Sequence, residues 1–296
     1  MKLTHFCLHL AWSLVALIRL HAQPLEHNGV TVPRADYTAR DGEIQKLRDR
    51  LISANQQTFQ PYTFLDPSGL SLPYRLFQPA EPKPGQRYPL LLVLHGAGSR
   101  GTDNLAHITG KHASITTGYW TLPEHQATHP CFVLAPQCPP EPQAWIKNPD
   151  WVEGRHPFHE TPAPALLATV HLLDRLLEEY PIDPARVYVL GASMGGYGTW
   201  DLLTRYPQKF AAAVPVCSGL ADGQAPKIAH LPVWVFHGTL DDVEPISGSR
   251  SAVAQLQRAG GHPRYTEYQG GDHGISLHAW TEPGLLEWLF SQKLSP

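Results

Sequence analysis

Short apolar segments recur along the chain, and each is bounded by turn-forming residues. They comprise residues 90–94, 132–135, 187–190, 211–216 and 233–236, and a further strand is predicted at residues 265–268. Apolar runs of this length, without polar alternation, are typical of strands buried on both faces of a sheet. The pattern therefore predicts a sheet that is covered on both sides.

Helical periodicity separates several of these strands. The clearest case covers residues 164–180, where the apolar positions recur at steps of four, three, four and three: Leu166, Val170, Leu173, Leu177 and Tyr180. That spacing gives a helix one apolar face. A helix is also predicted at residues 197–206, ahead of Pro207, and a weaker one at residues 43–51. Alternating strands and helices predict an α/β fold with a doubly wound, mostly parallel sheet, whose active sites gather at the carboxyl ends of the strands.

Two further segments predict an antiparallel hairpin ahead of this sheet. Residues 62–65 and 70–78 have strand patterns, and Asp66-Pro67-Ser68-Gly69 joins them. Proline and glycine in such a link are typical of a tight turn.

The N-terminus has the pattern of an export signal. Lys2 precedes an apolar run from Phe6 to Ile18, and Leu20-His21-Ala22 then leads to Gln23. The run is too short to span a bilayer, so residues 1–22 are predicted to be a cleaved signal peptide rather than an anchor, with a buried N-terminal helix as the alternative. We expect a secreted or periplasmic protein with no stable membrane anchor after cleavage.

Composition narrows the classes of partner. The chain has 296 residues, of which 42% are hydrophobic and 17% charged, which excludes a disordered or coiled-coil protein. A formal net charge of −3, with no block of like charges, gives no electrostatic reason to expect nucleic acid. No nucleotide-binding, H-E-x-x-H or C-x-x-C motif occurs, so no metal or cofactor is predicted. The expected partner is a small-molecule or polymer-linked substrate.

Three cysteines follow the predicted signal, Cys131, Cys138 and Cys217. An odd number leaves at least one free thiol and allows one disulfide in an oxidising compartment. Cys131 opens an apolar strand and is predicted to be a small core residue.

Ser193 is the candidate nucleophile. The strand at residues 187–190 leads into Gly191-Ala192-Ser193-Met194-Gly195, and the predicted helix follows. This G-x-S-x-G pattern places the serine on a strained strand-to-helix turn, where glycines avoid collisions with neighbouring backbone. The alternative is a glycine-rich turn with an incidental serine.

A serine nucleophile needs a histidine as base and a carboxylate that orients the histidine, here in the order Ser, Asp, His. Asp241, in the loop after the strand at 233–236, is the candidate acid, with Asp242 and Glu244 as alternatives expected to be solvated loop charges. His273, in the glycine-flanked loop after residues 265–268, is the candidate base. His278 is the weaker alternative, because a helix is expected to start there.

An oxyanion site is predicted after the strand at residues 90–94. His95-Gly96-Ala97-Gly98 matches the H-G-x-G loop, which supplies a backbone donor in many ester hydrolases. The amides of Ala97 and Met194 are the predicted donors. His95 is expected to bond within the loop rather than to transfer protons.

These segments together resemble the esterase and dienelactone-hydrolase branch of the α/β-hydrolases, especially secreted carboxylesterases, feruloyl esterases and polyhydroxybutyrate-depolymerase-like enzymes. The likeness covers roughly residues 72–290, and Ala135-Pro136-Gln137-Cys138-Pro139 belongs to it. It implies an α/β-hydrolase fold and hydrolysis of small aromatic or short aliphatic esters through an acyl-enzyme. It implies Ser193, Asp241 and His273 as the triad. The expected organisation is a signal peptide at 1–22, a lead-in at 23–60 and a catalytic domain at 61–296.

Two departures from the family pattern limit which properties of the family this resemblance implies for the chain. Dienelactone hydrolases use a cysteine where this chain has Ser193, so their substrate is not implied. Relatives often carry a tryptophan after the histidine loop, where this chain has Gly274-Ile275-Ser276. A prolyl-oligopeptidase-like serine peptidase and a non-catalytic binding protein on the same scaffold are the alternatives.

Aromatic residues in loops between the core strands are candidates for an acyl pocket or a polymer-binding rim, with core packing as the alternative. They are Tyr119, Trp120, Trp145, Trp151 and Phe158.

Overall fold

A computed structural model describes residues 29–80, 82–147 and 156–294. Its strands are β1 (Val30–Val32), β2 (Gln60–Leu65), β3 (Ser71–Phe77), β4 (Tyr88–Leu94), β5 (Phe132–Pro136), β6 (Ile182–Ala192), β7 (Ala212–Val216), β8 (Trp234–Gly238) and β9 (Arg264–Tyr268). All of the strands predicted from apolar runs are present, with ends that shift by a few residues.

These strands form one sheet in the order β1-β9-β8-β7-β6-β4-β5-β3-β2. Strand β3 pairs antiparallel with both β2 and β5, and the remaining pairs are parallel. The mostly parallel α/β sheet and the antiparallel β2–β3 hairpin are thereby confirmed. In the hairpin turn Asp66 Oδ1 accepts a hydrogen bond from the Ser68 amide, and Gly69 takes a positive φ of 88°. Both features are typical of turns built from these residue types.

Strand β1 was not predicted, because it has only three residues and no apolar run. It pairs parallel with β9, Val30 opposite Thr266, so the segment before residue 60 contributes an edge strand to the sheet. Backbone pairing with an existing edge is what orders so short a strand.

The longer helices are α2 (Asp41–Thr58), α6 (Pro164–Glu179), α7 (Met194–Arg205) and α9 (Ile246–Arg258). The shorter ones are α1 (Arg34–Thr38), α3 (Ala106–Thr109), α4 (Ala113–Gly118), α5 (Pro123–Thr128), α8 (Ala225–Ile228), α10 (Ser276–Trp280) and α11 (Leu285–Ser291). Helix α6 confirms the amphipathic pattern, and Pro164 at its first turn suits a position whose amide has no helical partner.

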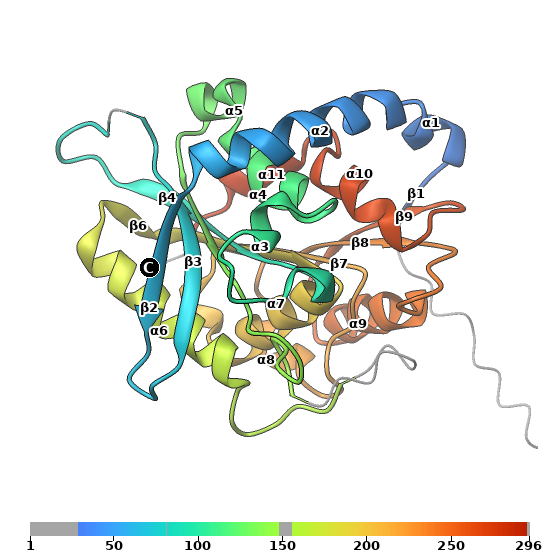
Figure 1. Ribbon diagram of the computed structural model, residues 1–296. Coiled ribbons are helices and arrows are strands. Elements are labelled where there is room, and N and C mark those ends of the chain that lie inside the picture. Colours follow the sequence, from blue (N-terminus) through green and yellow to red (C-terminus); the bar gives the residue numbers. More distant parts are fainter. Residues whose placement is uncertain (1–28, 81, 148–155, 295–296) are drawn as a thin grey trace, which may run out of the picture.

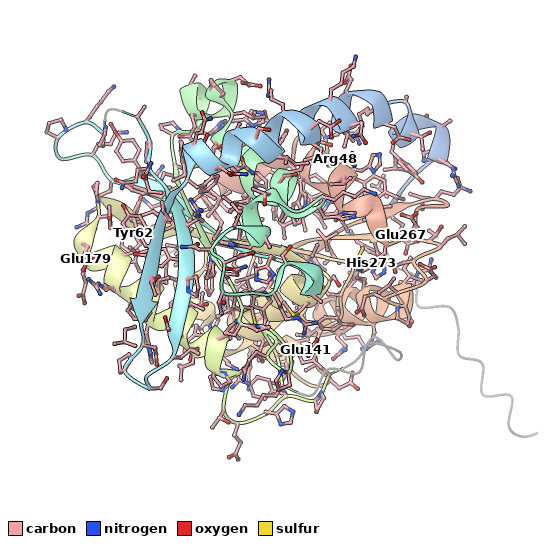
Figure 2. All side chains as sticks on the ribbon, in the orientation of Figure 1. Arg48, Tyr62, Glu141, Glu179, Glu267 and His273 are labelled. Atoms are coloured by element: carbon pink, nitrogen blue, oxygen red, sulfur yellow. The ribbon has the colours of Figure 1, made fainter. Side chains whose placement is uncertain are left out.

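Helices cover both faces of the sheet (Figure 1), and side chains fill the space on each side (Figure 2). Helices α6, α7, α8 and α9 pack on one face, and α1, α2, α3, α4, α10 and α11 pack on the other. On β4, Leu90, Leu92 and Leu94 belong to the first core, whereas Leu91 and Val93 belong to the second. A strand with two buried faces needs apolar residues at every position, which explains its unbroken run.

Two other predictions concern cysteines and export. Cys131, Cys138 and Cys217 are all buried free thiols, and no disulfide joins them. The predicted signal at residues 1–22 lies outside the described residues. In the part of the chain that is described, no helix has the length and apolar character needed to cross a membrane.

Candidate active site

The sharp turn at Ser193 is the centre of the site. Strand β6 ends at Ala192 and α7 begins at Met194, so one residue makes the whole connection, with φ 56° and ψ −124°. Helix α7 thus begins three residues earlier than predicted, because Gly195 and Gly196, which are weak helix formers, lie inside it. A side chain in this strained region of backbone space occurs where the surrounding structure holds it, and such positions cluster at functional sites.

Gly191 and Gly195 lie so close to neighbouring backbone that no side chain fits at either position. A Cβ added at Gly195 would lie 2.0 Å from the Leu94 carbonyl oxygen, and one added at Gly191 would lie 2.4 Å from the Gly195 carbonyl oxygen. Neither contact could be relieved by moving a flexible side chain. The first turn of α7 therefore packs directly against the end of β4, which brings Ser193 beside the loop that follows β4.

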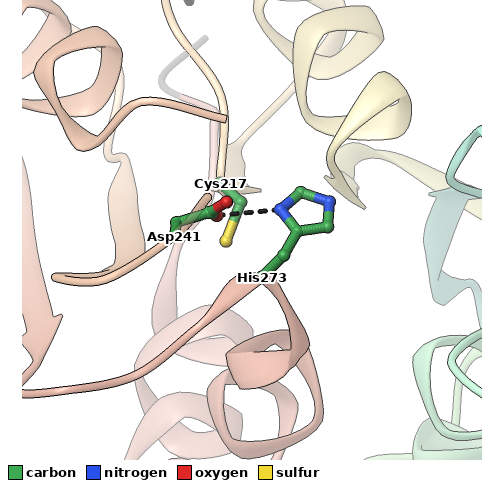
Figure 3. Close-up of side chains that lie close together, drawn as sticks. All are labelled: Cys217, Asp241 and His273. Carbon is green, nitrogen blue, oxygen red and sulfur yellow. Dashed lines mark hydrogen bonds and ion pairs between the residues drawn. The ribbon is translucent and has the colours of Figure 1, made fainter. Parts of the chain in front are cut away.

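The predicted acid and base lie in loops after the neighbouring strands β8 and β9. His273 Nδ1 is 2.8 Å from Asp241 Oδ2 (Figure 3). Because the carboxylate can only accept, Nδ1 donates, and Nε2 is left as the basic nitrogen of the neutral ring. Burial opposes protonation of His273, but the hydrogen bond and charge of Asp241 outweigh it and raise the pKa of the imidazole.

Asp241 is held by several donors. Its Oδ1 accepts from the amides of Val243 at 3.0 Å and Glu244 at 2.8 Å, and His237 Nε2 lies 3.3 Å from Oδ2. Burial disfavours the charge, yet the hydrogen bonds from His237 and His273 hold the pKa of Asp241 well below its usual range. The carboxylate is therefore ionised and fixed in orientation.

The alternatives to these residues have other environments. Asp242 is exposed, as expected of a loop charge. The same expectation is wrong for Glu244, which is only 2% exposed and accepts a hydrogen bond from the Tyr197 hydroxyl at 2.7 Å. Burial raises the pKa of Glu244 to about 7. His278 lies in α10 and bonds Asp41 at 2.7 Å.

Ser193 and His273 line one cavity of about 490 Å³. Among the described residues no hydrogen bond joins the two side chains, although they share the cavity wall. Catalytic hydrogen bonds of this kind are often long before substrate binds. The lining is mostly small: Gly96, Ala97, Gly98, Ser99, Gly110, Ala113, Thr116, Ala192, Cys217, Val243, Gly274 and Ser276, with His95, Lys111 and His112.

The loop after β4 lies beside the nucleophile. A Cβ built on Gly96 would lie 3.9 Å from Ser193 Cβ, and Ala97 opens a short 3-10 helix (Ala97–Ser99) that lines the cavity. His95 bonds within this region: Nδ1 donates to the Gly96 carbonyl at 2.7 Å, and Nε2 accepts from the Cys138 amide at 2.9 Å. Both ring nitrogens are occupied, so His95 orders the loop.

Sequence reasoning missed two residues that touch Asp241. His237 is fully buried and contacts Ser249 Oγ at 2.7 Å, and it lies four positions before Asp241 at the end of β8. Cys217, at the end of β7, has a positive φ of 48° and lies against Asp241 and His273 (Figure 3). The ligand atoms of these three residues lie within 4.8 Å of one another, a spacing that a metal ion could use, but here Asp241 and His273 bond each other.

None of the described loop aromatics lines this cavity. Trp120 is 1% exposed, Trp145 is fully buried and donates to the His95 carbonyl, and Tyr119 packs against the core. Phe158 lies under the cations of Arg205 and Lys227 at another surface. An aromatic acyl pocket built from these four is therefore wrong; Trp120 and Trp145 are core packing residues, and Trp151 lies outside the described residues.

Comparison with known proteins identifies the family. The family model described as "Putative esterase" matches residues 70–283, which is most of the chain. The chain belongs to this esterase family. Its fold is the α/β-hydrolase fold.

Individual relatives agree with that assignment. A crystal structure of a thermostable esterase superposes with a TM-score of 0.73 at 40% identity, covering 80% of this chain and 64% of that one. A bifunctional acetylxylan esterase/xylanase of Neocallimastix patriciarum is 41% identical over 73 residues, 24% of this chain and 11% of that protein. A poly(3-hydroxyalkanoate) depolymerase of Paucimonas lemoignei is 26% identical over 136 residues, 44% of this chain and 28% of that protein. The chain thus spans only a minor part of these two curated relatives.

Proposed function

We propose that this esterase cleaves small aromatic or short aliphatic carboxylic esters through a covalent acyl-enzyme on Ser193. The observation that carries the proposal is the bond between His273 Nδ1 and Asp241, because it leaves Nε2 as a base in the cavity that Ser193 lines. Ser193 sits on the strained turn that exposes its hydroxyl, and the acid is ionised.

In the first step Ser193 Oγ attacks the ester carbonyl carbon while His273 Nε2 takes its proton. The amides of Ala97 and Met194 donate to the oxyanion that forms, and the start of α7 adds a positive dipole end. The carbon–oxygen bond to the alcohol then breaks, and His273 returns the proton to the leaving oxygen. Water attacks the acyl-enzyme by the same route and releases the acid.

The dimensions and lining of the cavity support a small acyl group. The described lining gives this cavity a volume of about 490 Å³ and is mostly small residues, dimensions that suit a short acyl group. Two relatives are named for esters on polymers, acetylated xylan and polyhydroxyalkanoate. A polymer-linked ester is accordingly included in the proposed substrate class.

The assignment of Ser193 is tested by labelling with a fluorophosphonate and mapping the modified peptide by mass. We expect one adduct, on Ser193, and no adduct in Ser193→Ala. An adduct that persists in this variant would overturn the role of Ser193.

The substrate class is tested on nitrophenyl esters of increasing acyl length, methyl ferulate, a polyhydroxybutyrate film and a peptide anilide. We expect kcat/KM to be highest for short acyl esters and to fall sharply with chain length. Cleavage of the anilide without cleavage of any ester would favour a peptidase instead.

We also propose that the protein is exported, on the basis of residues 1–22. Expression of the full chain with its own N-terminus, followed by N-terminal sequencing of material outside the cytoplasm, should give a mature chain that begins at Gln23. Retention of the intact N-terminus inside the cell would contradict export.

A further inference from the structure

A second cavity of about 390 Å³ adjoins the catalytic cavity. The two share Lys111, His112 and Gly274 in their walls. Gly274 follows His273 directly in the chain, so the second cavity begins on the histidine side of the site. The two cavities are therefore neighbours that share this part of their walls.

The outer wall of the second cavity comes from α1 and α2. Asp41, Ile44, Gln45 and Arg48 line it, and this spacing places them on one face of α2. Figure 2 shows Arg48 on α2 and His273 on the same side of the molecule, and α2 runs over that side in Figure 1. The helices ahead of the main sheet thus complete a pocket next to the catalytic residues.

The acidic groups of this cavity are already engaged. Asp41 Oδ1 lies 2.7 Å from His278 Nε2, and Asp272 Oδ1 accepts from the Gly274 amide at 2.8 Å. These bonds fix α10 to α2 and shape the loop that carries His273. The lining thus holds three cationic side chains, Arg34, Arg48 and Lys111, against these two carboxylates.

The cations are less engaged. Arg34 donates to the Gly270 carbonyl at 3.3 Å, and Arg48 pairs with the exposed carboxylate of its neighbour Asp49, at 3.3 Å. Lys111 forms no ion pair or hydrogen bond with any described residue. Lys111 therefore offers an unpaired charge at the junction, and Arg48 on the outer wall is paired with a carboxylate that is itself mostly exposed to solvent.

The charges of Lys111 and Arg48 also act on His112. Burial lowers the pKa of His112 first, and the charges of Lys111, His273 and Arg48 lower it further, against the opposing charge of Asp272. Of these groups, Lys111 and Arg48 are permanently charged, so two cations act on the point where the two cavities meet. A negatively charged ligand group is favoured there.

The chemistry of the proposed reaction says which part of the ester enters this space. His273 returns its proton to the alcohol oxygen, so the alcohol leaves on the histidine side, where Gly274 and His112 also line the second cavity. The acyl group stays bound to Ser193 in the first cavity.

We propose that the second cavity is a subsite for the alcohol part of an ester that carries a free carboxylate, held by Lys111 and Arg48. The inference rests on the proposed function and narrows its substrate class to esters of hydroxy acids and related anionic alcohols.

The test uses two acetate esters with matched alcohols, para-(carboxymethyl)phenyl acetate and its neutral para-(carbamoylmethyl) analogue. Both give the same acetyl-enzyme, so deacylation is common to them and any preference arises in acylation. We expect kcat/KM to favour the carboxylate roughly fivefold, the effect of a partly exposed ion pair of about 1 kcal/mol. The preference should fall as salt is raised, because exposed charges are screened.

Variants are compared by the ratio of the two substrates, which cancels general damage to the protein. Lys111→Gln should bring the ratio close to one, Lys111→Arg should restore it, and Arg48→Gln should lower it partly. Lys46→Gln is the matched control, because Lys46 is an exposed cation on α2 that lines neither cavity, and its ratio should equal that of the wild type.

Equal kcat/KM for the two esters, or a preference that Lys111→Gln leaves intact, would overturn the subsite while ester hydrolysis itself remained. Failure to hydrolyse either ester would instead count against the proposed function.

Discussion

His273 Nδ1 lies 2.8 Å from Asp241 Oδ2, although 31 residues that include α9 and β9 separate them in the chain. The contact forms because β8 and β9 are parallel neighbours, so the loops at their carboxyl ends start side by side. Glu244 and Val243 hold the carboxylate through their amides. The imidazole is thereby fixed with Nδ1 protonated and Nε2 available.

Asp241→Asn should remove most of the activity without unfolding the protein. An asparagine can keep the shape of the contact, but its amide favours the wrong tautomer of His273, a change that costs about 10⁴-fold in kcat in a serine protease triad. We expect a loss of 10³-fold or more in kcat/KM for a nitrophenyl ester, by the same reasoning. Asp242→Asn, an exposed neighbour, is the control and should change kcat/KM less than about twofold. A mild effect of Asp241→Asn would show that this carboxylate does not orient the base.

The pH dependence of kcat/KM should reflect the raised pKa of His273. Protonated His273 cannot accept the Ser193 proton, so activity is present above the pKa and is lost as pH falls through it. Because the Asp241 contact raises that pKa above its ordinary 6.5, the acid limb should have its midpoint above pH 6.5. A pH–rate profile with a stable nitrophenyl ester measures it. A midpoint clearly below 6.5 would contradict the effect of Asp241.

Glu244→Gln should make the protein more stable at alkaline pH. The pKa of buried Glu244 is raised from 4.5 to about 7, so the folded state keeps a proton that the unfolded chain releases between these values. The contribution of Glu244 to the free energy of unfolding is therefore largest at acidic pH, and it falls as the pH rises toward 7. Above that pH the buried charge costs about 3 kcal/mol, which glutamine avoids.

The measurement is urea unfolding of wild type and Glu244→Gln at several pH values from acidic to alkaline. Their difference in free energy of unfolding should grow with pH and level off above neutrality. Glu43→Gln, at an exposed position in the first turn of α2, should show no such trend. A constant difference for Glu244→Gln would show that this carboxyl titrates normally.

Gly195→Ala should destabilise the protein by about 3 kcal/mol, because a Cβ there meets backbone that cannot move away. The collision is with the Leu94 carbonyl oxygen at 2.0 Å, so the turn that presents Ser193 should shift and activity should fall with stability. The control is Gly42→Ala, where an added Cβ has nothing within 4 Å. In helix α2 that change should stabilise by up to about 1 kcal/mol, since alanine is the better helix former. Thermal unfolding and esterase rates of both variants test this prediction.

Local sequence was sufficient for the main elements and for the turn at Ser193. The run at residues 90–94 is apolar at every position because both faces of β4 are buried, and this pattern is visible without a structure. The glycines around Ser193 are likewise visible in the sequence, although the backbone that Gly195 approaches, at Leu94, is remote in the chain. Strand β1 and several short helices have no such local signal, because contacts with distant segments order them.

The bond between Asp241 and His273, and the burial of Glu244 against Tyr197, become visible only when the folded chain is known. The contacts of His237 and Cys217 with Asp241 also depend on the fold, as does the position of Lys111 and Arg48 in the wall of a second cavity. Hydrophobic periodicity and turn chemistry are properties of residues that are close in the chain, so they can be recognised without a structure. Burial, pKa and the pairing of side chains depend on groups that are remote in the chain and meet only when the sheet is assembled.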